Sequence, residues 1–172
     1  MLIFSRGLLG NHQEETPLSS ATLTRLTVRY NSVAEIETRI ADFEGCRIPK
    51  EEWTHHAHLT MAAWYLHRYP ADEAVERIRT GIQRYNRATN DPNRPSTAYH
   101  ETITLFWIAM LRQHLSEAGE KGLVRLVNRL AGGWAHKELV FEYYSRELLF
   151  SNTARAEWVP PDLKPLPSGT DC

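Results

Sequence analysis

The chain has few of the features that mark secreted or membrane proteins. It has two cysteines in 172 residues, Cys46 and Cys172, and they form no CxxC pair or other metal-ligand spacing. We therefore expect no disulfide framework and a reducing, cytoplasmic location. No window reaches the roughly 18 apolar residues that a membrane-spanning helix needs. The apolar start at residues 1–10 is too short for a signal peptide and is interrupted by Arg6.

Neither sign of charge is in excess. The 20 Lys and Arg residues oppose 21 Asp and Glu residues, which gives a formal net charge of -1. Such a chain has no overall field that would attract nucleic acid or anionic lipid. The sequence also has no GxSxG, P-loop or GxGxxG motif, so a serine hydrolase elbow and a nucleotide phosphate cradle are unsupported. We predict no nucleic-acid partner and no membrane partner.

Helical periodicity predicts an all-α fold. The chain shows no internal repeat and no alternation of strands with helices, which favours a single-domain helical bundle of about six helices. A chain of this length can bury about 70% of its unfolded surface. We expect a poorly ordered leader over residues 1–31, a helical bundle domain over residues 32–158 and an extended Pro-rich tail over residues 159–172. The segment 23–30 fits either a short strand or a weak helix, although a lone strand would have no second strand to pair with.

Capping residues define the expected helices. Ser32 and Glu35 form a capping box, and Gly45 is expected to end that helix in the left-handed conformation. Thr54 is expected to cap a second helix, which ends near residue 69 before Pro70.

The later helices follow from apolar spacing. A third helix is expected from about residue 71, and Gly81 within it indicates close packing. A fourth, over about 97–117, is apolar almost all round and so belongs at the centre of the bundle. Weaker patterns predict helices over 123–131 and 135–144 and short helical turns capped by Ser145 and Ser151.

Histidines stand at the start of the second and fourth helices. His55 and His58 are three residues apart, so they share a face and begin the buried stripe. His100 begins a core-facing stripe on the fourth helix. If the two helices are neighbours, these three imidazoles meet in a cavity. His56 falls on an adjacent face, where we expect it to be solvated.

A set of three histidines with one carboxylate suits one divalent transition metal, and Zn, Fe, Mn and Ni are not distinguishable by spacing. Glu101 is the predicted fourth ligand or general base, with Glu52 or Glu51 as alternatives. A water bound to such a metal would have its pKa lowered toward about 7. A helix N-terminus also disfavours protonated histidine, which keeps the rings in the neutral form that binds metal. A di-iron site is disfavoured because the Glu-x-x-His pattern occurs once.

The same residues also have a structural explanation, because histidines at helix starts often cap helices or hydrogen-bond within the core. Two functions therefore remain open. The first is a metal-binding protein, with or without metal-dependent enzymatic activity on a small polar substrate. The second is a non-catalytic helical protein-interaction module with structural histidines.

Two motifs carry a resemblance. Thr54-His55-x-x-His58-Leu59 and Tyr99-His100-Glu101-Thr102-Ile103-Thr104 resemble the motifs of a family of small bacterial all-helical proteins. The similarity covers roughly residues 33–165 and implies a helical fold without a particular activity. The architecture also resembles DinB-like bundles, which hold a metal with three histidines. Their usual His-x-x-x-His pair is replaced here by His-x-x-His and His-Glu, so their activity is not carried over.

Overall fold

The computed structural model describes residues 28–89, 99–118, 122–131, 133 and 135–167. Within these ranges all regular elements are helices and no strand occurs, which confirms the all-α prediction. The elements are α2 (Val33–Glu44), η2 (Lys50–Glu52), α3 (His55–Arg68), α4 (Ala71–Thr89), α5 (Glu101–Ala118), α6 (Gly122–Ala131), η3 (Lys137–Glu142), α7 (Arg146–Leu149) and α8 (Asn152–Ala156). None of the described helices is both long and apolar enough to cross a membrane.

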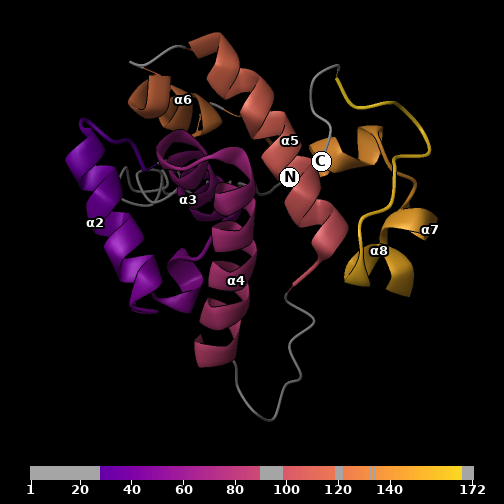
Figure 1. Cartoon of the computed structure of the whole chain (residues 1–172), viewed down its shortest axis with the longest axis horizontal. Helices are drawn as coiled ribbons and strands as arrows, with labels where there is room; N and C mark the ends of the chain where they lie inside the picture. Colours follow the sequence, from indigo (N-terminus) through magenta and orange to yellow (C-terminus); the bar gives the residue numbers. More distant parts are fainter. Residues whose placement is uncertain (1–27, 90–98, 119–121, 132, 134, 168–172) are drawn as a thin grey trace, which may run out of the picture.

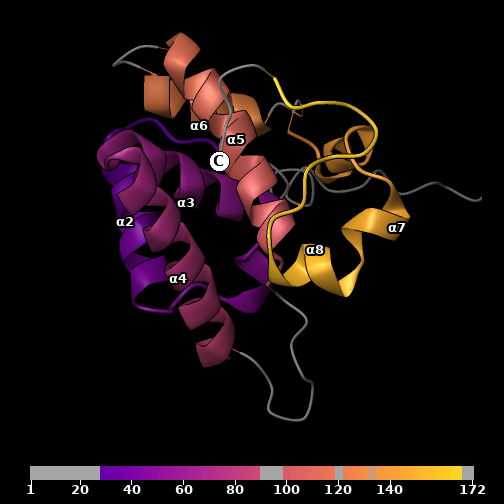
Figure 2. The same ribbon diagram turned by 45° about the vertical axis from the view of Figure 1, so that its right-hand side comes forward.

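Helix α3 is the hub of the bundle. It contacts α2, α4, α5 and α6, and its buried side chains are mostly small or apolar: Ala57, Leu59, Thr60, Met61, Ala62, Ala63 and Tyr65. The apolar helix α5 packs against α3, α4, α6 and α8, so it shares the central position that we predicted for it. Figures 1 and 2 show α2 on one side of the molecule and α7 and α8 on the opposite side, next to α5.

The predicted caps are present, with one correction. The Ser32 hydroxyl accepts a hydrogen bond from the Glu35 N–H at 3.3 Å, and the Glu35 carboxylate accepts one from the Asn31 N–H at 2.9 Å. The left-handed conformation that we assigned to Gly45 is instead adopted by Cys46, with a φ of 54°, whereas Gly45 has a φ of -81°. The helix still ends where predicted, but the chain reverses one residue later.

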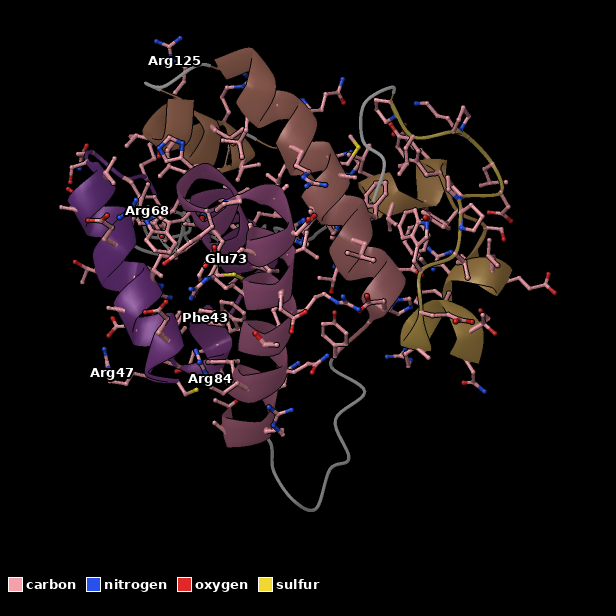
Figure 3. The ribbon with its side chains drawn as sticks, viewed as in Figure 1. Phe43, Arg47, Arg68, Glu73, Arg84 and Arg125 are labelled. Atoms are coloured by element: carbon pink, nitrogen blue, oxygen red, sulfur yellow. The ribbon has the colours of Figure 1, made fainter. Side chains whose placement is uncertain are left out.

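Gly81 lies at a close contact between helices, as predicted. Phe43 projects between α2 and α4 (Figure 3), and a Cβ atom on Gly81 would lie 2.9 Å from two carbons of its ring. That ring also stacks on Trp53, with ring centroids 4.9 Å apart. The absence of a side chain at Gly81 therefore lets α2 and α4 approach each other across an aromatic cluster.

The described part of the N-terminal segment belongs to the packed domain. Residues 1–27, which hold most of the predicted leader and of the ambiguous segment 23–30, lie outside the described residues. Tyr30 is buried, its N–H donates to Asn128 Oδ1 at 2.9 Å, and its carbonyl accepts from Asn128 Nδ2 at 2.8 Å. The packed domain therefore includes Tyr30, which we had assigned to the leader.

The C-terminal segment folds back over the bundle. The predicted helix over 135–144 is wrong in type, because the structure has the shorter 3-10 helix η3 there. Ser145 and Ser151 cap α7 and α8, as predicted. Residues 159–167 contain no helix or strand; the Leu163 N–H donates to the Tyr143 carbonyl at 3.0 Å, and the Tyr144 hydroxyl donates to the Val159 carbonyl at 2.9 Å.

Candidate functional site

A pocket of about 430 Å³ lies where the N-terminal halves of α3 and α5 meet α4, η3 and α8. Its walls are mainly apolar and include Leu59, Ala62, Ile78, Ile103, Trp107 and Phe150. His55, His58 and His100 all line it, so the structure places the three histidines around one pocket. A volume of several hundred Å³ with few polar groups is typical of sites for small organic molecules.

His58 is held by its own helix and by an aromatic neighbour. Its Nδ1 lies 2.7 Å from the Thr54 carbonyl, and its ring lies 3.9 Å from that of Trp53 between centroids. Burial lowers the pKa of His58 to about 4, although the Thr54 carbonyl acts in the opposite direction. Because a carbonyl oxygen only accepts, Nδ1 carries the hydrogen of the neutral ring, and the lone pair is left on Nε2.

His55 is fixed by a segment distant in sequence. Its Nε2 donates to the Ala135 carbonyl at 2.9 Å, and its ring meets the Trp107 ring edge-on at a centroid distance of 4.7 Å. Burial lowers the pKa of His55, with the Ala135 carbonyl acting against it. The neutral ring therefore keeps its lone pair on Nδ1.

His56 is not the solvated residue that we expected. It is half-buried, its Nε2 donates to the Val127 carbonyl at 3.2 Å, and burial lowers its pKa. His56 therefore ties the start of α3 to α6, on a different side of the helix from the pocket.

His100 has no ring nitrogen left for a ligand. Its Nε2 donates to the Leu149 carbonyl at 2.7 Å, and its Nδ1 accepts from the Ile103 N–H at 3.3 Å. Burial lowers the pKa of His100, and the positive charge of Arg155 acts in the same direction. His100 thus caps α5 and joins it to the end of α7.

Glu101 points toward α4 and does not line the pocket. It is buried, forms an ion pair with Arg79, and accepts a hydrogen bond of 2.5 Å from the Tyr99 hydroxyl. Burial raises the pKa of Tyr99, and the Glu101 carboxylate adds to this increase. Both oxygens of Glu101 are therefore engaged within the protein.

The four predicted ligands do not form a metal site. In the part of the chain that the structure describes, no group of three or more His, Cys, Asp or Glu side chains is placed to hold a metal ion. Both nitrogens of His100 and both oxygens of Glu101 already have partners. The alternative carboxylate Glu52 pairs instead with Arg39 at 2.9 Å. The donor set does not fit the transition-metal centre that the sequence suggested.

Two cationic side chains that the sequence analysis missed also line the pocket. Lys137 comes from η3 and Arg155 from α8. Single basic residues on short helical segments carry no spacing signal, because most of them are solvated. Their position in the pocket depends on how the C-terminal segment folds back onto α3 and α5.

The resemblance of the two histidine motifs to a bacterial helical family stays a prediction. Its support remains the residues themselves, which the structure places at the start of α3 and at the start of α5. Comparison of the chain with family models, with curated proteins and with solved structures gives no match.

Proposed function

We propose that the protein binds a small organic molecule in this pocket, with His58 and His55 as hydrogen-bond acceptors. The observation that supports the proposal most is the state of His58, a neutral ring with Nδ1 fixed by a carbonyl, in the wall of a cavity of about 430 Å³. His58 is half-buried, and the lone pair on its Nε2 can accept a hydrogen bond from a donor group of a ligand in the pocket. The ligand therefore carries a hydroxyl or N–H group on an apolar body.

Binding is better supported than proton abstraction. A general base works best when its pKa lies near the pH at which it operates. A pKa of about 4 leaves His58 a weak base at neutral pH, although it can still accept a hydrogen bond. The predicted base Glu101 does not line the pocket and is paired with Arg79. We therefore assign the histidines a recognition role.

The second candidate is the interaction module with structural histidines. It is favoured by the fact that each pocket histidine donates to a backbone carbonyl. It does not account for a cavity at the same place. A metal-binding function has weaker support than either, because two of its four predicted ligands are fully engaged. The cytoplasmic location stays a prediction.

Ligand-observed NMR on the untagged protein tests the proposal. The probes are small aliphatic and aromatic alcohols and amides. Ala62, a buried residue of the pocket wall, is replaced by Phe to fill the cavity, and His67→Gln on the exposed side of α3 is the control. We expect saturation transfer to several probes in the wild type and the control, and its loss in Ala62→Phe with the thermal transition retained.

Two results would contradict the proposal. One is the absence of transfer to any probe in the wild type. The other is saturation transfer in Ala62→Phe that equals saturation transfer in the wild type. Elemental analysis of the same untagged sample distinguishes small-molecule binding from metal binding. A metal-binding protein would contain stoichiometric metal, and the His58→Ala variant would lose it.

A further inference from the structure

We infer that the ligand is an amphipathic monoanion, whose acidic head faces Lys137 and Arg155 while its apolar body fills the pocket. This inference rests on the proposed function and specifies its substrate class. The observations behind it are the charged side chains that line the pocket, the half-buried position of Arg155 and the volume of the pocket.

The described lining of the pocket is positively charged. Lys137 and Arg155 contribute two cations, and no Asp or Glu side chain is among the lining residues. Glu101 is in the first turn of α5, next to the lining residues Ile103 and Thr104, but its carboxylate is directed to Arg79 and away from the pocket. Glu138 lies 3.7 Å from Lys137 Nζ, but both side chains are more than half exposed, so their attraction is weak in water. The lining side chains therefore carry two positive charges and no negative charge, and Glu138 beside Lys137 offsets part of their attraction for an anion.

Each cation lies beside a histidine that is neutral. Burial is the main cause of the lowered pKa of both histidines; the charge of Arg155 further lowers the pKa of His100, whereas at His55 the effect of Lys137 is outweighed by the opposite effect of Glu138. Arg155 is half-buried, and its Nη1 donates to the Tyr99 carbonyl at 3.3 Å, which holds the side chain against the start of α5. A partly desolvated guanidinium attracts an anion more strongly than a fully hydrated one.

The rest of the pocket suits a hydrocarbon body. Its apolar wall extends to Phe150, which is 53% exposed although it is a large hydrophobic residue. At about 30 Å³ for each water-sized group, the pocket has room for about fourteen such groups. A chain of eight carbons with a group at each end is within this limit.

Calorimetric titration of the full chain with three matched compounds tests the inference. The compounds are ω-hydroxyoctanoate, the diol of the same length and the corresponding amino alcohol, so each offers a hydroxyl to the histidines and only the head differs. We expect the carboxylate to bind about ten-fold more tightly than the diol, because charge-assisted hydrogen bonds are the stronger ones, and the amino alcohol to bind most weakly.

Variants locate the charge effect. Lys137→Gln and Arg155→Gln are each expected to weaken carboxylate binding several-fold while the diol affinity stays unchanged. The diol thus reports whether the pocket is still folded in each variant. Arg125→Gln is the matched control, because Arg125 is exposed on α6 and projects away from the molecule (Figure 3).

The outcomes separate the two proposals. Equal affinity for the carboxylate and the diol, or tighter binding of the amino alcohol, overturns the inference and leaves small-molecule binding standing. Carboxylate binding that is reduced equally in Arg125→Gln also overturns it. Failure of all three compounds to bind overturns the inference together with the proposed function.

Discussion

The neutral state of half-buried His58 predicts that acid destabilises the fold through this residue. Its pKa is about 4 in the folded chain against an ordinary value of 6.5. Between these two values the unfolded chain binds more protons than the folded one, so the free energy of unfolding falls as the pH falls. The contribution is fully present above about pH 6.5 and is lost by about pH 4.

The size of the effect follows from the two pKa values. One pK unit corresponds to about 1.4 kcal/mol, so the whole displacement is worth about 3 kcal/mol. Over the range from about pH 7 to about pH 5, the loss from His58 alone is about 2 kcal/mol. His55, His56 and His100 also have lowered pKa values, so the wild-type chain should lose more than this.

Urea unfolding at the two pH values measures the effect in the wild type and in His58→Asn. The Asn amide can still donate to the Thr54 carbonyl but does not titrate. We expect the variant to lose about 2 kcal/mol less than the wild type on acidification. His67→Asn, at an exposed position on the same helix, should behave like the wild type. If the wild type and His58→Asn lose the same stability, the lowered pKa of His58 in the folded chain is refuted.

Three further predictions concern the packing and capping of the helices, and each is measured by urea unfolding at neutral pH. Arg79→Ala leaves Glu101 buried without its cation and should cost about 3 kcal/mol, whereas Glu101→Gln should cost less; equal losses would contradict the ion-pair assignment. Gly81→Ala should cost about 1–3 kcal/mol because its Cβ meets the Phe43 ring, and Phe43→Leu in the same chain should recover part of this. An unchanged midpoint would show that the ring moves freely. Ser32→Ala should cost about 1 kcal/mol through the lost cap of α2, and no loss would show that Asn31 and Glu35 suffice.

The helix boundaries were predictable because they are set locally. Ser32, Thr54, Ser145 and Ser151 each cap a helix through a hydrogen bond to an N–H three residues later, and this relation is visible in the sequence. That His55, His58 and His100 line one pocket was also predictable, since helical spacing places them on inward faces of neighbouring helices.

The chemistry of the site was not predictable, because it depends on backbone carbonyls from distant segments. Ala135 is 80 residues from His55, and Leu149 is 49 residues from His100. No side-chain pattern encodes these contacts, yet they determine which ring nitrogens are occupied. The role of Glu101 was missed for a similar reason. As the residue after His100, it is rotated by about 100° around the helix axis, and its carboxylate pairs with Arg79 on α4. For these reasons no group of three or more donor side chains in the described part of the chain is placed to hold a metal ion, and metal binding stays a prediction.

The most direct test of the account is the protonation of the imidazole nitrogens, measured by long-range ¹H–¹⁵N NMR on histidine-labelled protein at neutral pH. We predict neutral rings, with the hydrogen on Nδ1 in His58 and on Nε2 in His55 and His100, and an Nε2 signal of His58 that moves when a pocket ligand is added. A charged ring at residue 58, or a hydrogen on its Nε2, would contradict the account. So would signals of all three histidines that shift together on addition of Zn²⁺.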